Sequence, residues 1–521
     1  MDDGSNRVHA DGRTRTSSPV PPKRTYRSEL RLVQITAPTD AYLPPRDDQL
    51  SQEWLDGRRW LDEVTRHERV EPAAAVRDEP PASESDDGES EVSFGRPVPL
   101  AGDLSYRRID GLHVWVVVPS AAIVVLNGDE ERVMRLLVEG ATPAGCVQRL
   151  AGELDDQDVG GVLVLVARVV QRLAEKGFVR GIRGRTDAKV AAPHRFMRIH
   201  LTQKCNLTCV HCYADSSPWA ATDSSITLER WCRLLDDFAA TGGEQLLLTG
   251  GEALLHPDCV PIMRHAHELR VKVVLFTNGF LVPRYLDDIA RYVDEVQVSI
   301  DGPTPASNDR VRGAGSFGRA VHAVDLLLEK TDVHVRVNTV AMEQNWDDLR
   351  RNYLSFADRW STHDVEFRIG FGVTEHGRAE GLNDGLEVSE TRPVVNELLT
   401  KVYGGRQPII ARRNPSCGYA EQVVVGQDGS IHPCHLMDGA LAHIDDGPYR
   451  DLIARIAATA GQYDVDHTLG CNRCDIRYLC GGTCRVMNGK GTGNRRVTTC
   501  SAGDKLGKLR NLARAFSSGG S

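Results

Sequence analysis

The chain has 521 residues and a mass of 57.3 kDa, a length that predicts roughly two to four domains and excludes a small disulfide scaffold. Its 63 basic and 72 acidic residues leave a net charge of −9, which argues against nucleic acid bound along the whole chain. No apolar run is long enough for a signal peptide or a membrane span, so we expect a cytoplasmic protein with no membrane partner. The 13 cysteines should therefore stay reduced, and their clustering favours metal binding.

Residues 1–103 lack sustained periodicity and are rich in Pro, Ser and Asp. The run Asp78–Glu91 has seven acidic residues and no basic one. We therefore expect a disordered extension that ends in an acidic linker. Inside it, Trp54–Val64 carries apolar residues at helical spacing, which fits either a docking helix or a transient one.

Residues 104–185 predict a small α+β domain like a winged helix, in which short strands precede three helices. The expected strands are 112–118 and 121–126, and the expected helices are 130–138, 143–151 and 159–176. Basic and acidic residues balance at ten each, not counting Arg185, so DNA binding is not favoured.

This layout resembles the PqqD-like domain, the recognition element of enzymes that mature ribosomally made peptides (RiPPs). The resemblance implies that residues 104–185 bind the leader of a precursor peptide as an added strand beside the third helix. Arg168, Arg172 and Lys176 are spaced four apart on that helix and would form one basic stripe. The stripe fits either an acidic leader or a solvated helix face.

Residues 196–371 alternate strands with amphipathic helices, which predicts an α/β fold with a partial, TIM-like (β/α)6 barrel. The expected strands are 197–202, 245–249, 272–277, 295–300, 333–340 and 365–370. Active-site groups of such folds lie on the loops after the strands. The residues that follow each strand are therefore the first candidates for a site.

Three cysteines, Cys205, Cys209 and Cys212, follow the first strand with the spacing CxxxCxxC. Three thiolates can bind three irons of a [4Fe-4S] cluster and leave the fourth iron open, whereas zinc with His211 as a fourth ligand is the alternative. Other strands end in polar residues or glycines that would share this face of the barrel, namely Gly250, Gly251, Glu252, Asn278, Ser299 and Asp301.

With these motifs the region resembles the radical S-adenosylmethionine (radical SAM) superfamily, whose reduced cluster cleaves the cofactor to a 5′-deoxyadenosyl radical. The resemblance implies that Cys205, Cys209 and Cys212 ligate the cluster and that Gly250, Gly251 and Glu252 bind the methionine amine. It also implies a ribose contact from Ser299 and an adenine contact from Tyr213. Asn278, Ser299 and Asp301 are equally consistent with capping or turn residues.

Seven more cysteines lie near the C-terminus, and alone they would suggest a zinc ribbon. After a radical SAM barrel their order resembles the SPASM extension of peptide- and protein-modifying enzymes. That resemblance implies two auxiliary [4Fe-4S] clusters and leaves the fourth ligand of the three-cysteine set open. The two sets are Cys417, Cys434 and Cys484, and Cys471, Cys474, Cys480 and Cys500. His435, beside Cys434, is either a base or a hydrogen-bonding neighbour.

These features together predict a radical SAM oxidoreductase that forms a thioether or carbon–carbon crosslink in a precursor peptide. It would use S-adenosylmethionine, three [4Fe-4S] clusters and an external electron donor such as flavodoxin or ferredoxin. The alternatives are a SPASM enzyme that modifies a folded protein or makes a peptide-derived redox cofactor, and a non-enzymatic winged-helix and zinc-ribbon regulator. The expected divisions are 1–103, 104–185, 196–371, a connector at 372–416, 417–505, and a C-terminal helix and tail at 506–521.

Overall fold

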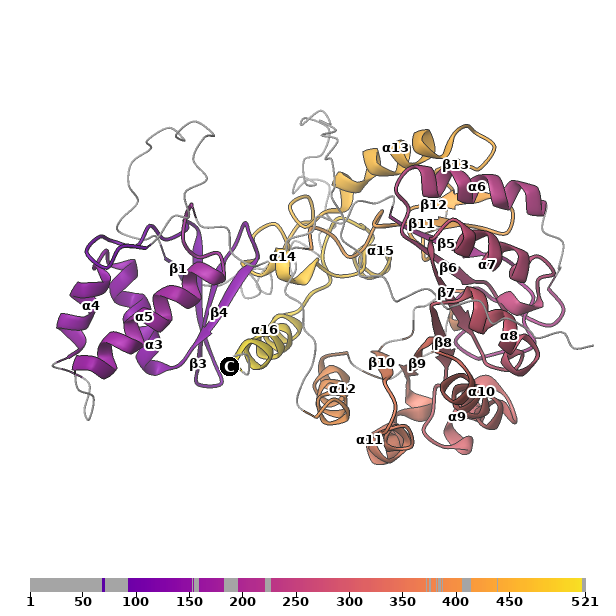
Figure 1. Ribbon diagram of the computed structural model, residues 1–521, viewed down its shortest axis with the longest axis horizontal. Coiled ribbons are helices and arrows are strands. Elements are labelled where there is room, and N and C mark those ends of the chain that lie inside the picture. Colours follow the sequence, from indigo (N-terminus) through magenta and orange to yellow (C-terminus); the bar gives the residue numbers. More distant parts are fainter. Residues whose placement is uncertain are drawn as a thin grey trace, which may run out of the picture. The chain divides into compact units, whose positions relative to one another are not determined.

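The computed structural model describes residues 68–70 and 92–517, apart from 152, 154–158, 182–194, 221–225, 372, 374–375, 381, 383–385, 387, 405–413 and 438 (Figure 1). The suggested helix Trp54–Val64 and the acidic run Asp78–Glu91 lie outside the described residues. None of the helices described is both long and apolar enough to cross a membrane.

The N-terminal domain is a four-stranded antiparallel sheet with three helices on one face. Its strands are β1 (Glu68–Val70), β2 (Leu104–Ile109), β3 (Leu112–Val117) and β4 (Ala122–Leu126), in that spatial order. Its helices are α3 (Gly128–Val138), α4 (Pro143–Leu150) and α5 (Val159–Glu175). Asn127 caps α3 in a capping box with Glu130, and Thr142 caps α4 ahead of Pro143, so each helix begins where local chemistry favours it.

The expectation that residues 1–103 are wholly disordered is wrong in two places. Strand β1 pairs with β2 through the register Glu68 to Tyr106, and Val98 and Leu100 are buried in the core that Trp115 and the helices share. Two apolar residues in a polar stretch carry too little periodicity to be recognised, although each buries its side chain. The domain therefore begins before residue 104.

The central domain is built on six parallel strands in the order in which they occur in the chain. They are β5 (Phe196–His200), β6 (Gln245–Thr249), β7 (Lys272–Thr277), β8 (Glu295–Ser299), β9 (His334–Ala341) and β10 (Val365–Phe371). Each agrees with its expected range within two residues. Their carboxyl ends share one edge of the sheet, so the loops after β5 to β8 are neighbours.

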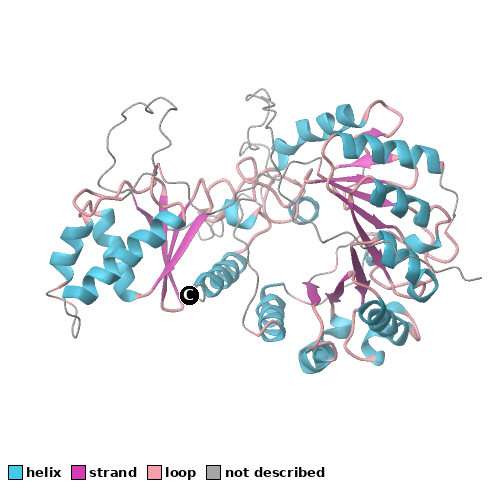
Figure 2. Cartoon of the chain, viewed as in Figure 1, coloured by secondary structure: helices cyan, strands magenta, loops and turns pink. Residues whose placement is uncertain are grey.

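Helices cover the outer face of this sheet (Figure 2). They are α6 (Leu228–Ala240), α7 (Cys259–Glu268), α8 (Val282–Tyr292), α9 (Pro305–Arg312), α10 (Ser316–Lys330), α11 (Glu343–Asp358) and α12 (Val388–Val402). Two 3₁₀ turns, η3 (Ala253–Leu255) after β6 and η4 (Gly377–Ala379) beside the cysteine loop, lie in the loops that follow the strands. Helix α6 shows why the helices pack on the sheet, because Trp231, Leu234, Leu235 and Phe238 form its buried stripe. The connector predicted at 372–416 thus contains a helix that joins the core of the barrel.

The C-terminal region continues the barrel sheet. Strand β11 (Gln422–Val425) pairs in parallel with β5, and β12 (Ser430–His432) and β13 (Ala442–His443) follow as antiparallel strands. Beyond them lie α13 (Tyr449–Ala460), η5 (Gly461–Tyr463), α14 (Arg477–Cys480), α15 (Arg485–Thr492) and α16 (Ala502–Ser517). Helix α16 packs on the second face of the N-terminal sheet, where Leu509 and Ala513 share a core with Val114, Ile123 and Val125.

Candidate active site and cysteine sets

The loop after β5 carries Cys205, Cys209 and Cys212 into one cavity of about 270 Å³ at the carboxyl ends of the strands. Burial, together with the neighbouring charges of Glu252, Cys209 and Cys212, raises the pKa of Cys205 to about 12. Thiols this close would repel one another as anions, so they fit a site where a cation or cluster offsets their charge. Among the described residues, no three His, Cys, Asp or Glu side chains lie close enough together to bind one metal ion as they stand.

Two arginines hold this cysteine loop. The guanidinium of Arg378 donates to the carbonyl of Cys209 at 3.1 Å and pairs with Asp215 at 3.0 Å. The Nε of Arg312 lies 2.6 Å from a carboxylate oxygen of Asp301, and its Nη1 is 4.0 Å from the sulfur of Cys209. Both arginines line the cavity beside the thiols. They therefore place positive charge where three thiolates would need it.

Asp301 has a different place from the one that the sequence suggested. Its carboxylate is completely buried, accepts the amide of Val340 at 2.8 Å and pairs with His211 at 3.3 Å and with Arg312. It does not line the cavity. The carboxylate is used in tying the cysteine loop to the ends of β8 and β9, which agrees with the alternative of a capping or turn residue, and a cofactor contact from Asp301 stays a prediction.

Most of the other predicted cofactor residues do line this cavity, namely Gly250, Gly251, Asn278, Ser299 and Tyr213. A Cβ on Gly250 would lie 2.5 Å from the carbonyl oxygen of Thr202, and one on Gly251 would lie 2.4 Å from that of Lys204. Only glycine therefore lets this turn approach the cysteine loop. The cradle and the thiol donors fit a cluster that carries S-adenosylmethionine.

Glu252 turns away from the cavity. Its side chain is completely buried and accepts hydrogen bonds from the hydroxyl of Thr277 at 3.0 Å and from the amides of Asn278 and Leu254. Burial raises the pKa of Glu252 to about 7, although these donors favour the anion. The structure thus shows Glu252 joining the ends of β6 and β7, and its contact with the cofactor amine stays a prediction.

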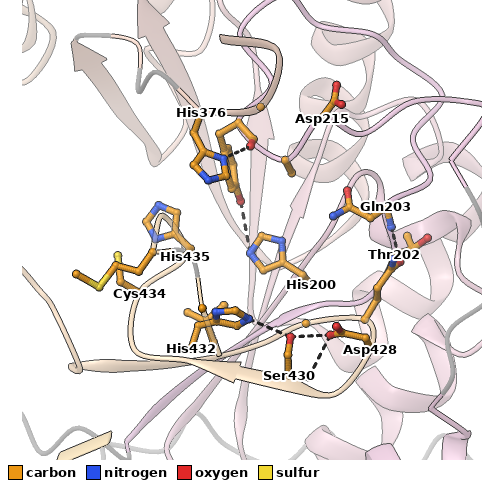
Figure 3. A pocket seen from close by; sticks show the side chains of 18 residues that line it. His200, Thr202, Gln203, Asp215, His376, Asp428, Ser430, His432, Cys434 and His435 are labelled. Carbon is orange, nitrogen blue, oxygen red and sulfur yellow. Dashed lines mark hydrogen bonds between the residues drawn. The ribbon is translucent and has the colours of Figure 1, made fainter. Parts of the chain in front are cut away.

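A second cavity of about 440 Å³ adjoins the first, and Tyr213 lines both. Its walls include four imidazoles that come from different elements: His200, His376, His432 and His435 (Figure 3). His376 donates from Nδ1 to the carbonyl of Tyr213 at 2.9 Å, and His432 bonds Ser430, whose hydroxyl donates to Asp428 at 2.6 Å. The ring of His435 meets that of Tyr213 edge to face at 5.6 Å between centroids.

The sequence pointed to only one of these histidines, His435. His200 ends β5, where alternation along the strand directs every second side chain to the same face, and this signal was available. The sequence carries no such signal for His376, which lies in a loop, or for His432, which ends the short strand β12. Strand β12 reaches the barrel because it pairs with β11, which in turn pairs with β5.

The family comparisons agree with this geometry. Residues 199–354, about a third of the chain, match the model of the Radical SAM superfamily. These residues form a radical SAM domain. Over 350 residues the chain is 29% identical to a PqqA peptide cyclase of Ruegeria pomeroyi, a match that covers 62% of this chain and 91% of that one.

Two further comparisons are more limited. The AdoMet-dependent heme synthase of Methanosarcina barkeri is 32% identical over 162 residues, 30% of this chain and 46% of that protein, so the chain spans less than half of that relative. The crystal structure of Streptococcus suis SuiB bound to S-adenosylmethionine superposes with a TM-score of 0.48 at 14% identity, over 77% of this chain and 99% of that one.

The C-terminal cysteines gather into two groups beyond the radical SAM domain. Burial raises the pKa of Cys434, and the charges of Cys417 and Cys484 raise it further, so these three thiols are close neighbours. Burial likewise raises the pKa of Cys500, which the charges of Cys480, Cys471 and Cys474 also raise. These neighbours are consistent with the two sets that the SPASM resemblance implied, but Cys484 also lines the cavity of the four-cysteine set, so the division between the sets stays a prediction. Cluster binding by either set stays a prediction.

The four-cysteine set lies in a cavity of about 430 Å³ and is joined to the N-terminal sheet through Asp475. The carboxylate of Asp475 accepts the hydroxyl of Ser105 at 2.7 Å and pairs with Arg107 at 3.0 Å and with Lys505 at 2.6 Å. Although burial opposes ionisation, Lys505 and Arg107 hold the pKa of Asp475 well below its usual range. Its neighbour Cys474 packs in the core that α16 shares with the sheet.

The predicted basic stripe on α5 is interrupted at its centre. Arg168 is exposed and Lys176 half-buried, but Arg172 pairs with Glu130 at 3.4 Å and donates to the carbonyl of Phe516 in α16. A guanidinium already neutralised by a carboxylate offers little to an acidic leader. Leader binding by the remaining two residues stays a prediction.

Proposed function

We propose that the chain is a radical SAM enzyme that modifies a ribosomally made precursor peptide. The observation that supports this most directly is the single cavity in which Cys205, Cys209, Cys212 and the Gly250–Gly251 turn meet at the carboxyl ends of the strands. The peptide substrate rests on the relationship to a PqqA peptide cyclase over 91% of that protein. The N-terminal domain would bind the leader, since β4 forms one edge of its sheet.

Each part of the site has a task in this account. Cys205, Cys209 and Cys212 would hold the cluster, Gly250 and Gly251 would let the cofactor backbone approach, and Arg312 would offset the thiolate charge. When bound and reduced by a carrier such as flavodoxin or ferredoxin, the cluster and S-adenosylmethionine supply a 5′-deoxyadenosyl radical. The second cavity would receive the substrate residue next to Tyr213, and its walls would exclude water from the radical.

The C-terminal sets would complete the reaction. Cys434 lines the same cavity as Tyr213, so the three-cysteine set borders the place where we expect the substrate. The cysteines of both sets would hold auxiliary [4Fe-4S] clusters, which would supply an acceptor for the electron left after hydrogen abstraction. The product would carry a thioether or a carbon–carbon crosslink. The set of Cys417, Cys434 and Cys484 has only three thiols, so its cluster would keep one ligand position for the substrate or for a carboxylate.

Mass spectrometry of a precursor peptide tests this function. A peptide encoded by a short reading frame beside the gene is incubated anaerobically with reconstituted enzyme, S-adenosylmethionine and dithionite. We expect the peptide to lose two hydrogens and deuterium from a labelled peptide to enter 5′-deoxyadenosine. A variant with Cys205, Cys209 and Cys212 changed to Ala is the control. Formation of 5′-deoxyadenosine with no change in any leader-bearing peptide would contradict the assignment to peptide maturation.

A further inference from the structure

Arg198 is a cation inside the barrel that the proposed chemistry does not use. It occupies the middle of β5 and lines the cysteine cavity, where its guanidinium lies 5.8 Å from the centroid of the Phe276 ring. Its Nε is completely buried and makes no hydrogen bond to any residue that the structure describes. The phenol of Tyr213 accepts a hydrogen bond from its side chain. Arg198 therefore stands at the wall between the two cavities.

The other two arginines of this cavity have carboxylate partners, but Arg198 has none. Arg312 pairs with Asp301 and Arg378 pairs with Asp215. Within the described part of the chain, no carboxylate lies within ion-pair distance of Arg198. Its neighbours His200 and His435 cannot supply a counter-charge, because an imidazole never carries a negative charge. Among the described residues, Arg198 is thus the arginine of this cavity that has no carboxylate partner.

Arg198 is half-buried with its Nε fully covered, so a ligand that brings a negative charge would find a guanidinium without a carboxylate partner there. A guanidinium matches a carboxylate best, because its planar N–H groups can donate two parallel hydrogen bonds. In the proposed reaction the carboxylate of S-adenosylmethionine and an acidic side chain of the substrate are the two candidate partners. The position of Arg198 favours the substrate, since it adjoins Tyr213, His200 and His435, which line the second cavity.

We propose that Arg198 binds an aspartate or glutamate side chain of the substrate peptide and so holds the neighbouring carbon between the two cavities. This inference rests on the proposed function and adds the chemical class of the substrate residue. It makes Arg198 a specificity-determining residue, because an amide in place of the carboxylate would leave the guanidinium unpaired.

Binding of a minimal acidic probe tests the assignment. The reconstituted full-length protein with S-adenosylmethionine is titrated anaerobically with N-acetylglutamate N-methylamide and with its glutamine counterpart, and binding is followed by saturation-transfer NMR. We expect Arg198→Gln to weaken binding of the acidic probe about tenfold or more and Arg198→Lys to restore part of it. Arg350→Gln is the matched control, since Arg350 also lies over an aromatic ring, that of Trp346, at 5.9 Å but on the exposed side of α11.

Separate results would overturn the inference. Equal binding of the acidic and amide probes, no binding of either probe to the wild-type protein, or unchanged binding in Arg198→Gln would each exclude a substrate carboxylate at Arg198. A weaker affinity for S-adenosylmethionine with unchanged probe binding would assign Arg198 to the cofactor. Arg198→Met should not lower the melting temperature, whereas a purely structural role predicts that it does. The proposed function is tested separately, since it fails if the wild-type protein forms no 5′-deoxyadenosine or leaves every leader-bearing peptide unchanged.

Discussion

Gly251→Ala tests whether the turn after β6 must touch the cysteine loop. The new Cβ would lie 2.4 Å from the carbonyl oxygen of Lys204 and 2.9 Å from the Cβ of Cys205, whereas ordinary contacts begin at 3.4 Å. Gly251 does not have a positive φ, so the change adds a steric clash without backbone strain. The turn and the loop must therefore separate by about 1 Å, and neither side offers a flexible side chain that can yield.

The cost of that displacement follows from general magnitudes. Overpacking of this kind destabilises a protein by about 1–3 kcal/mol. A displacement of about 1 Å in a reacting group lowers a rate by about 100-fold, or about 2.7 kcal/mol. We therefore expect Gly251→Ala to bind less iron at Cys205, Cys209 and Cys212 than the wild-type protein does. We also expect it to cleave S-adenosylmethionine about 100-fold more slowly per cluster.

The assay compares iron content, cofactor affinity and 5′-deoxyadenosine formation in Gly251→Ala and in Gly318→Ala. Gly318 lies in α10 and a Cβ there meets nothing within 4 Å, so this control should stabilise the helix by roughly 0.5–1 kcal/mol and leave cleavage unchanged. Wild-type iron content and cleavage in Gly251→Ala would refute the close approach of the turn to the cysteine loop.

Three other predictions follow from single contacts. Asp475→Asn removes the carboxylate that pairs with the buried Lys505, so we expect the free energy of unfolding to fall by about 3–5 kcal/mol and amide exchange in β2 to become faster. Unchanged amide exchange would contradict the connection that Asp475 makes to the N-terminal sheet. Because the pKa of Glu252 is about 7 in the folded protein against 4.5 ordinarily, its contribution to stability should fall by about 3 kcal/mol between pH 4.5 and 7. Melting curves of the metal-free protein should show this slope, and Glu252→Gln should remove it. Arg168→Ala should weaken the binding of an acidic leader peptide, measured by fluorescence anisotropy, whereas Arg172→Ala should mainly lower stability because Arg172 pairs with Glu130. Equal losses of affinity in the two variants would show that Arg172 also contacts the leader.

Local patterns in the sequence predicted the regular elements well. All six barrel strands and the three N-terminal helices agree with their expected ranges within two residues, because apolar periodicity and capping residues are encoded locally. The first cysteine set was equally clear, since three ligands on one loop need no tertiary information. The division of the C-terminal cysteines into two sets was predicted from the resemblance to the SPASM extension, because their spacing alone does not show which cysteines lie together.

Long-range pairings explain what the sequence did not reveal. The histidine cavity exists because β11 pairs with β5 and carries His432 and His435 to the barrel. The place of Asp301 could not be predicted, because its partner Arg312 lies at the end of the next helix, α9. Arg172 was placed in an open stripe, but α16 and Glu130 cover it. None of these partners leaves a periodic signal.

Iron content and the low-temperature EPR spectrum of the anaerobically reconstituted protein show directly whether Cys205, Cys209 and Cys212 hold a cofactor-binding cluster. We expect about twelve irons, falling to about eight when these three cysteines are changed to Ala. We also expect S-adenosylmethionine to alter the wild-type spectrum and not that of the variant. Equal iron in both proteins, or a wild-type spectrum that S-adenosylmethionine leaves unchanged, would contradict a cofactor-binding cluster at these cysteines.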